Sequence, residues 1–544
     1  MSVHVYAAGH RGEGICLGLT LGPYRILLDC GLAGLDPYLG LSPPADWVVC
    51  SHAHGDHARA LLDLHRAFPD LPIYSSQPTV RLLPLQWPQE TDIGIEAWCT
   101  GVSWRTPLDL GPDLTLELLP AGHLPGAAMT RLTYRRPERA YSVLYTSDFL
   151  LANTRLVEGV RLEELRGFHP DVLIVEGSQG TRRHARRRQL ENQLAERIAW
   201  ALSQRQGVIL AVPPVGLGQE VLMLLRSHHL FTGREVQIWV DGQVAAACDV
   251  YVELLPHLPA AVQNFARHQS LFWDDRVKPR VERWPAGRPW LPDQPPSILI
   301  TDAPLDWDSW FEMDPAEVLM PWLVLLPDRP AGQTWDFPFY QSPGAAEALE
   351  GLMALDRIQM ETYILPQHSD GPATVQLIHT LRPQHVVFVH GDPLYLGDLA
   401  GLEELHSRYQ VHVPSANHDL PLPVDQPFLH SSPPETTATF EGEVVETGTG
   451  VVVNLPATLL GDPRWQMLGD TGLVEARWQG EELVLRGLSQ REALEQQYSG
   501  GQPPDRRCCA NCVFSRGQRC GNPDSPMRGL RVAPEGFCSG FVFR

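Results

Sequence analysis

One heptapeptide limits what this chain can fold into: Ser51-His52-Ala53-His54-Gly55-Asp56-His57, which directly follows the apolar stretch 47–50. A short apolar run bounded by polar residues is typical of a buried strand. Three imidazoles and a carboxylate at the end of such a strand are costly to bury unless a cation satisfies them. Imidazole and carboxylate are also the ligands of zinc at hydrolytic sites. The segment therefore predicts a metal site at the edge of a buried sheet.

Several other polar residues stand at the ends of predicted strands. The strands are expected at 25–28, 114–119, 142–145, 172–175 and 386–389, and the residues that follow them closely are Asp29, His123, Asp148, Glu176 and His390. Apolar strands of this kind, alternating with helical stretches, indicate sheets covered by helices. Asp29 is expected to orient a metal ligand from behind, as carboxylates often do for coordinating histidines.

Taken together and in this order, these residues resemble the metallo-β-lactamase fold, an αββα sandwich with a di-zinc site at the edge of its sheets. The resemblance implies that His52, His54 and His123 hold one zinc ion. It implies that Asp56, His57 and His390 hold the other, with Asp148 bridging the two; manganese is the alternative metal. Two such ions would hold a hydroxide as nucleophile and stabilise the developing negative charge.

A long segment separates Asp148 from His390, with strands expected at 208–212 and 363–365 and helices at 189–203 and 219–226. Glu176 stands before this segment, and His368 and His390 stand after it. This order resembles the metallo-β-CASP family of ribonuclease J and the cleavage-and-polyadenylation endonuclease, in which a further α/β domain is inserted. The resemblance implies a ribonuclease in which Asp56, Glu176 and His368 take part in catalysis. His368, oriented by Glu176, would be the general acid, and a histidine at position 390 favours RNA over DNA.

Other interpretations of the same residues stay open at this stage. His368 could instead cap the helix expected to begin near Pro372. The chain could be a di-zinc hydrolase of a small phosphodiester or ester, or a binding subunit with weak or no nuclease activity. The arginines of 182–188 are either a solvated helix face or, at Arg182 and Arg183, a contact to RNA phosphates.

The charge and hydropathy of the chain restrict its partners and location. A net charge of −21 excludes a general nucleic-acid coat, because phosphates are bound through Lys and Arg, but not an enzyme with a local basic channel. No apolar run is long enough to span a bilayer, so no membrane partner is expected. Charged and polar residues near the N-terminus argue against a signal peptide, and the expected location is the cytoplasm. A protein partner or a second copy of the chain is a further candidate partner.

The expected fold class is α/β (α+β), with several domains because 544 residues exceed what one core usually serves. Residues 1–195 and 361–425 would form the metallo-β-lactamase domain, and 196–360 the inserted β-CASP domain. A small β-rich domain, a β-barrel, is expected at 436–495. It would be either a nucleic-acid platform or an interaction module.

Five of the ten cysteines lie in the last part of the chain, 505–544. Cys509, Cys512, Cys520 and Cys538 give the spacing C-x2-C-x7-C-x17-C, with Cys508 as an alternative first ligand. Four thiolates can hold a [4Fe-4S] cluster or a structural zinc ion, and nearby phenylalanines favour the cluster. Free or disulfide-bonded cysteines are the remaining alternative.

Overall fold

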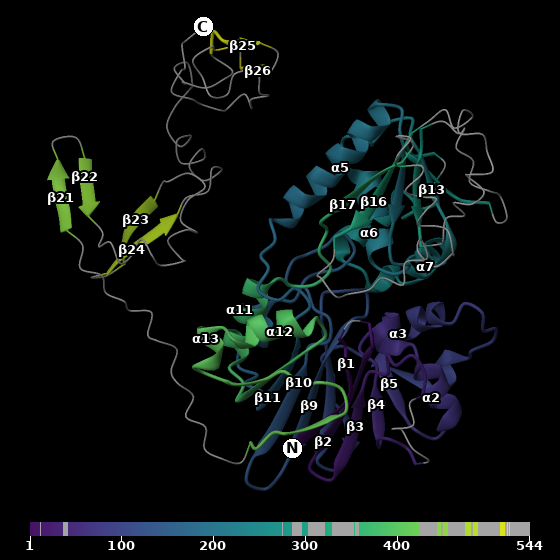
Figure 1. The fold of residues 1–544 in the computed structure, drawn as a ribbon, viewed down its shortest axis with the longest axis vertical. Coiled ribbons are helices and arrows are strands. Elements are labelled where there is room, and N and C mark those ends of the chain that lie inside the picture. The colour runs from purple at the N-terminus through teal and green to yellow at the C-terminus, as the bar shows by residue number, and fades with distance from the viewer. Residues whose placement is uncertain are drawn as a thin grey trace. The chain divides into compact units, whose positions relative to one another are not determined.

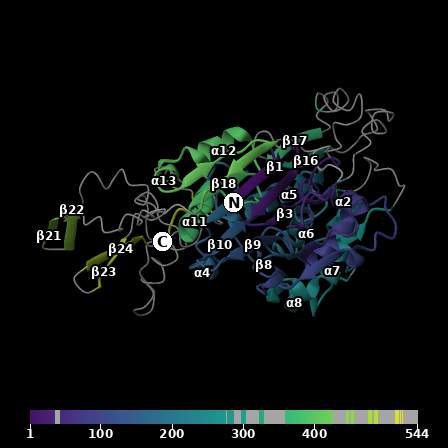
Figure 2. The same cartoon turned by 90° about the horizontal axis from the view of Figure 1, so that it is seen from below.

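The computed structural model describes residues 1–424 except 11, 36–41, 275, 286–295, 303–320, 329–352 and 354–357. Beyond residue 424 it describes only 443–447, 450–454, 474–479, 482–487, 512–516, 519–520 and 522. By their contacts, residues 1–431 form one compact unit and residues 432–544 another. The elements named below in the first unit can be followed in Figures 1 and 2.

Two seven-stranded sheets carry the predicted metal-site residues. The first has the order β20-β1-β2-β3-β4-β5-β6, with bounds β1 (Ser2–Ala8), β2 (Ile15–Leu21), β3 (Tyr24–Leu28), β4 (Trp47–Val49), β5 (Ile73–Ser76), β6 (Cys99–Val102) and β20 (His418–Pro421). The second has the order β19-β18-β11-β10-β9-β8-β7, with bounds β7 (Leu108–Gly111), β8 (Leu114–Pro120), β9 (Ala128–Arg135), β10 (Ala140–Tyr145), β11 (Val172–Glu176), β18 (His385–Val389) and β19 (Gln410–His412). In each sheet one half is antiparallel and the other half parallel.

The inner faces of these sheets share one hydrophobic core. In β11, Val172 and Ile174 belong to the cluster that also holds side chains of the first sheet, whereas Leu173 and Val175 belong to the cluster on the helical side. Successive side chains of a strand point to opposite faces, so a strand covered on both sides is apolar throughout. This explains why the short strands 172–175 and 386–389 were recognisable as continuous apolar runs. The architecture is that of the metallo-β-lactamase fold.

The helices cover the outer faces of the sheets, as Figure 1 shows for α2 and α3 beside β4 and β5. Those of the first part are α1 (Gly55–Ala58), α2 (Leu61–Ala67), α3 (Gln77–Leu82), η2 (Leu83–Gln86), η3 (Ile95–Ala97) and α4 (Leu162–Leu165). Those near the end of this unit are α11 (Gly371–Leu381), α12 (Pro393–Ala400) and α13 (Glu403–His406). Among all helices described, none has the length and apolar character that a bilayer span requires.

A third sheet is built from the segment between β11 and β18. Its order is β14-β13-β15-β12-β16-β17, all parallel, with bounds β12 (Gly207–Ala211), β13 (Gln237–Val240), β14 (Arg280–Arg283), β15 (Ile298–Thr301), β16 (Trp322–Pro327) and β17 (Ile358–Tyr363). Its helical segments are α5 (Arg187–Ser203), α6 (Leu217–Ser227), α7 (Gly242–Glu253), η4 (Leu255–His257) and α8 (Ala260–Ala266). This sheet lies where the insertion was predicted, but the domain boundaries themselves stay a prediction.

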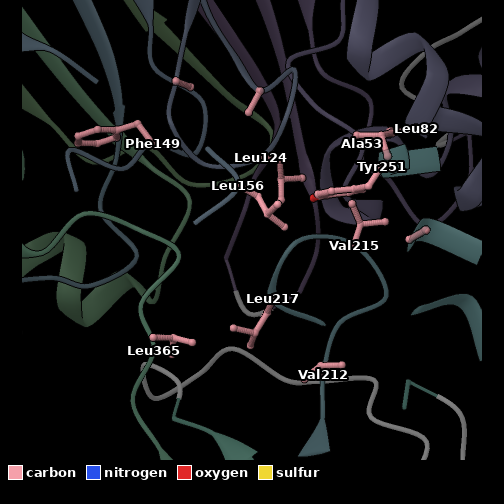
Figure 3. Packing of buried hydrophobic residues seen from close by; sticks show 14 of the residues in the cluster. Ala53, Leu82, Leu124, Phe149, Leu156, Val212, Val215, Leu217, Tyr251 and Leu365 are labelled. Atoms are coloured by element: carbon pink, nitrogen blue, oxygen red, sulfur yellow. The ribbon is translucent and has the colours of Figure 1, made fainter. Parts of the chain in front are cut away.

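The third sheet shares a core with the rest of the first unit. One hydrophobic cluster includes Leu124 and Phe149, from loops of the second sheet, together with Val215 and Leu217 from the start of α6. Figure 3 shows these side chains of the cluster, with Phe149 set apart from the other three. A Cβ added to Gly216 would lie 2.4 Å from Leu124 Cδ2, so the two loops are in close contact. The position of the third sheet is therefore fixed by packing against the loops that carry His123 and Asp148.

The strand predicted at 363–365 is wrong. The strand is β17 and ends at Tyr363, and Leu365 is buried in the loop that follows. An apolar tripeptide marks burial, and burial alone does not distinguish a strand from a buried loop. The other predicted strands and helices of the first unit are confirmed within a few residues.

The described residues of the second unit form three short hairpins: β21 (Glu443–Thr447) with β22 (Gly450–Asn454), β23 (Val474–Gln479) with β24 (Glu482–Gly487), and β25 (Ser515–Arg516) with β26 (Arg519–Cys520). The first two lie in the predicted β-rich domain, and its closure into a barrel stays a prediction. In the cysteine segment, Cys512 is buried and is not in a disulfide. Cys508, Cys509 and Cys538, and the side chain of Cys520, lie outside the described residues.

Replacing Leu116 by Ala should destabilise the protein by about 2–5 kcal/mol, because its side chain is fully buried between the two sheets and leaves a cavity. Leu394→Ala is the matched control: this side chain is 68% exposed on α12, and its loss should change stability by less than about 0.5 kcal/mol. Urea unfolding followed by tryptophan fluorescence measures both. Equal effects would contradict the assignment of Leu116 to the inter-sheet core.

Candidate metal centre

Four connections at strand ends bring the predicted metal-site residues together. His52 and His54 follow β4, and the short helix α1 carries Asp56 and His57. The others follow their strands singly: His123 after β8, Asp148 after β10 and His390 after β18. All but His54 and Asp56 are buried.

The backbone turns sharply after the strands β3, β10 and β18. Asp29, Ser147 and His390 have φ angles of 60°, 54° and 51°, in the left-handed region that side chains other than glycine rarely adopt. Next to Asp29, Gly31 lets α1 approach, since a Cβ there would lie 1.6 Å from the carbonyl oxygen of Asp56. Such strain persists only where surrounding contacts enforce it, and three of the nine described residues other than glycine that have a positive φ lie at this candidate site.

The carboxylate of Asp148 lies between two groups of histidines. Its Oδ2 is 3.5 Å from His52 Nε2 and 3.7 Å from His123 Nε2. Its Oδ1 is 3.3 Å from His57 Nε2 and 3.0 Å from His390 Nδ1. Each oxygen therefore faces its own pair of imidazoles, which is the arrangement that a bridging carboxylate requires.

The remaining predicted ligands complete these two groups. His54 Nδ1 lies 3.1 Å from His123 Nε2, and Asp56 Oδ2 lies 3.2 Å from His390 Nε2. Potential ligand atoms within 4.8 Å of one another form three overlapping groups: His52, His54, His123 and Asp148; Asp56, His57 and His390; and Asp148, Glu176, His368 and His390. The first two groups have the composition that the sequence predicted for two metal ions.

In three of the histidines, the ring nitrogen that points away from the site is held by a group outside these sets. His57 Nδ1 donates to Asp29 Oδ2 at 2.8 Å, and His123 Nδ1 donates to the carbonyl oxygen of Gln367 at 2.8 Å. His54 Nε2 donates to the carbonyl oxygen of Val215 at 3.2 Å. These bonds fix the tautomer and ring orientation, so that the other nitrogen presents its lone pair to the site.

Asp29 is itself held by three donors. It accepts hydrogen bonds from the backbone N–H of Ser51 at 2.6 Å, the Ser51 hydroxyl at 2.8 Å and the Tyr145 hydroxyl at 2.7 Å. The Ser51 and Ser147 hydroxyls both lie 3.1 Å from His52 Nδ1. The sequence had given no role to Ser51, Tyr145 or Ser147, although each adjoins or nearly adjoins a predicted ligand in the chain.

Four buried side-chain atoms that face the centre make no hydrogen bond: His52 Nε2, His57 Nε2, His390 Nδ1 and Asp148 Oδ1. Asp148 Oδ1 lies 3.3 Å from His57 Nε2 and 3.0 Å from His390 Nδ1, and His52 Nε2 lies 3.5 Å from Asp148 Oδ2, but none of these contacts has the geometry of a hydrogen bond. Buried polar atoms without partners are rare and call for an explanation. Divalent cations bound by these atoms would satisfy all four, so the residues fit the metal that the sequence predicted.

The pKa values also describe a centre that favours cations. Burial lowers the pKa of His52 and lowers that of His123 to about 3, so both imidazoles are neutral ligands. Burial opposes charge on His57 as well, but the Asp148 and Asp29 carboxylates raise its pKa to about 10. Burial likewise opposes ionisation of Asp148, yet the neighbouring histidines hold its pKa well below its usual range. The buried negative charge therefore attracts positive charge, which a metal ion supplies.

Glu176 and His368 are in contact, as predicted. His368 Nδ1 donates to Glu176 Oε2 at 2.9 Å, and the same carboxylate accepts from the N–H of Phe149 at 2.8 Å and the hydroxyl of Ser178 at 2.6 Å. Although burial opposes its charged form, the Glu176 carboxylate raises the pKa of His368. The alternative that His368 caps a helix is wrong: the N-cap of α11 is Asp370, whose side chain accepts from the N–H of Ala373.

The arginine segment does not form one helix face, because α5 begins at Arg187 and the preceding arginines lie in the loop before it. Arg182 and Arg183 are exposed, and Arg182 Nη1 lies 3.2 Å from Asp328 Oδ2. Arg187 is different, with a side chain only 10% exposed. It donates to the carbonyl oxygen of Pro366 at 2.7 Å and lies 3.5 Å from Glu220 Oε2. Arg187 thus holds the loop that carries His368, a role that the sequence did not reveal.

A cavity of about 410 Å³ opens beside the centre. The residues that line it include His54, Asp56, His123, Asp148, His368 and His390, together with Pro213, Pro214, Val215 and Leu217 from the segment between β12 and α6. The candidate centre is therefore reached from a cavity whose walls come from both the two-sheet part and the third-sheet part of the first unit.

Comparisons with known proteins agree with this geometry. Residues 24–208 match a family model described as a beta-lactamase superfamily domain. An uncharacterized protein of Synechocystis sp. is 46% identical over 98% of this chain and 96% of its own length. The transcription termination factor FttA of Methanothermobacter thermautotrophicus is 25% identical over 71% of this chain and 66% of its own length. The probable RNase MJ4 of Methanocaldococcus jannaschii is 28% identical over 42% of this chain and 56% of its own length.

The chain belongs to the metallo-β-lactamase superfamily, a group of metal-dependent hydrolases. FttA and RNase MJ4, to which this chain is similar, are members of the metallo-β-CASP family.

Asp29→Asn should weaken metal binding by about 10–100-fold, because the amide no longer offers the charged acceptor that orients His57. Zinc content after equilibration with a graded series of chelator concentrations measures the affinity. Asp109→Asn, an exposed aspartate on β7, is the matched control and should retain the wild-type affinity. Equal affinity of the Asp29 and Asp109 variants would exclude the proposed orienting role.

Arg187→Gln should lower the free energy of unfolding by about 3–5 kcal/mol, because it leaves the buried Glu220 carboxylate without its cation. The neighbouring Arg188 is exposed, and Arg188→Gln should stay within about 0.5 kcal/mol of the wild type. Urea unfolding of both variants tests the difference. A change of the same size at both positions would show that Arg187 is an ordinary surface arginine.

Proposed function

We propose that this protein is a β-CASP ribonuclease that cleaves RNA phosphodiester bonds with two zinc ions, manganese being the alternative. His52, His54 and His123 would hold one ion and Asp56, His57 and His390 the other, with Asp148 between them. The observation that carries this proposal is the placement of Asp148, each of whose carboxylate oxygens faces a separate pair of imidazoles.

The ions, when bound, would supply the nucleophile and neutralise charge on the phosphate. His368 would hold the proton that the leaving oxygen needs, at its Nε2, because its Nδ1 is engaged with Glu176. Glu176 is buried and fixed by Phe149 and Ser178, so it keeps the imidazole in one orientation and stabilises its protonated form. His368 also lines the cavity, where a substrate phosphate would lie.

RNA is the substrate class best supported. The two archaeal relatives carry the names of a transcription termination factor and a probable RNase. The histidine at position 390 is, by the family resemblance, the residue of RNA-processing members. The net charge of −21 restricts binding to a local surface, and the candidates for it are the cavity and the exposed Arg182 and Arg183.

A hydrolase of small phosphodiesters or esters is the second candidate. It is favoured by one observation: the cavity is lined by Asp56, Asp148 and Asp328, and such a wall repels a long polyanion. The two candidates differ in whether end-labelled RNA is cut.

The parts of the chain outside the centre complete the proposal. Residues 1–195 and 361–425 would form the metal-binding domain, 196–360 the inserted domain, 436–495 a small β domain and 505–544 a segment that holds an iron–sulfur cluster or zinc. The protein would act in the cytoplasm, alone or with a protein partner or a second copy.

The test is cleavage of a mixed, end-labelled RNA by the zinc- or manganese-loaded protein. His368→Ala should slow cleavage by about 10²–10⁴-fold and keep the metal content, because it removes only the proton donor. Asp56→Ala should lose both metal and activity. His379→Ala is the matched control, since this half-buried histidine lies on α11 beside Tyr409 and does not line the cavity.

Two outcomes would contradict the proposal. Cleavage by His368→Ala at the wild-type rate would remove His368 from the chemistry. Intact RNA with two bound zinc ions, together with hydrolysis of a small phosphodiester, would favour the second candidate.

A further inference from the structure

Among the described residues that line the cavity beside the centre, Arg59 is the one arginine or lysine. Among the described residues that line it, the charged side chains other than histidine are Asp56, Asp148, Asp328 and Arg59. A cavity that must accept a phosphodiester needs positive charge beyond the two metal ions, because every neighbouring phosphate of the strand is also charged. Among the described lining residues, Arg59 is thus the one whose positive charge does not depend on pH.

The backbone of Arg59 is fixed. Arg59 follows α1 and lies two residues after His57, its N–H donates to the carbonyl oxygen of Gly55 at 2.8 Å, and its own carbonyl accepts from Trp87 Nε1 at 3.0 Å. The side chain extends along α1. A Cβ built on Gly55 would lie 4.0 Å from Arg59 Nε and 3.0 Å from Gln86 Oε1, so the glycine leaves room for both side chains at the cavity wall.

The guanidinium of Arg59 is without a partner among the residues that the structure describes. Within the described part of the chain it makes no side-chain hydrogen bond and no ion pair, although the residue is half-buried. Asp56, three residues earlier, is engaged with His390 instead. Arg187, an arginine of comparable burial, is paired with Glu191 and Glu220. A partly desolvated guanidinium whose neighbours leave it unpaired is poised for an external acceptor.

We propose that Arg59 forms a phosphate subsite that binds the phosphate next to the scissile one in an RNA strand. The planar guanidinium offers paired N–H donors that match two phosphate oxygens. Arg59 belongs to none of the three groups of potential metal ligands, so its charge acts beside the metal centre rather than within it. The inference rests on the proposed ribonuclease function and deepens it, since it identifies a residue that recognises the sugar-phosphate backbone of the RNA.

Binding of a short, unstructured, fluorescent RNA measured over a range of salt concentrations tests this subsite. All proteins carry His368→Ala and are zinc-loaded, so that binding is measured without cleavage. Adding Arg59→Gln should weaken binding by about tenfold or more, because a charged hydrogen bond is lost. The slope of log affinity against log salt should fall by about 0.7, the value for one phosphate contact on a single strand. Arg59→Lys should keep the slope and lose part of the affinity.

Arg66→Gln is the matched control: this arginine lies on α2, is exposed, pairs with Glu90 and does not line the cavity. It should bind RNA like the parent. Zinc content of every variant is measured alongside. An unchanged slope for Arg59→Gln overturns the subsite, and so does a loss of zinc that accounts for the weaker binding.

The failure of this inference is distinguishable from failure of the proposed function. Cleavage of RNA is assayed separately, with Arg59 and His368 both intact. Cleavage with an unchanged salt slope for Arg59→Gln removes the subsite and leaves the ribonuclease in place. A reduced slope without cleavage supports the subsite and contradicts the nuclease.

Discussion

The buried carboxylate of Asp148 is the group on which the arrangement of this centre depends. Its two oxygens face four imidazoles that come from separate connections, after β4, in α1, after β8 and after β18. A buried carboxylate among buried imidazoles is costly unless charge is balanced and ligand atoms are satisfied. The two sheets must therefore be correctly placed relative to each other for these atoms to meet. The hydrophobic core that the two sheets share fixes that placement.

The part of the chain that contains the third sheet also contributes hydrogen bonds that orient residues of the centre. The carbonyl of Val215, from the segment that leads into α6, accepts from His54, and Arg187 of α5 holds Pro366 in the loop of His368. Gln367, the next residue, accepts from His123. Segments between β11 and β18 thus orient a predicted metal ligand and the predicted general acid. A movement of the third sheet would therefore change the orientation of His54 and His368 through these hydrogen bonds.

Local backbone strain and a charged group without a partner among the described residues occur together at the candidate site. Asp29, Ser147 and His390 adopt left-handed backbone angles, and the guanidinium of Arg59 has no partner among the described residues. Elsewhere in the described part, buried charges such as Glu220 and Arg187 are paired. At such a cavity, strained residues and unsatisfied groups cost stability and serve binding, as they commonly do at functional sites.

The sequence by itself determined the strands, the ligand types and the family. An apolar run that ends in His or Asp indicates both a buried strand and a candidate functional residue at its end. The heptapeptide Ser51 to His57 is specific enough to indicate the fold. What only the tertiary structure decided are contacts between residues far apart in the chain. Tyr145 contacts Asp29, Arg187 contacts Pro366, and Arg59 lines the cavity without a side-chain partner among the described residues. No local sequence pattern predicts such contacts. A tyrosine or an arginine has the same sequence context on a surface as in a functional site, and only the packing of distant segments determines its neighbours.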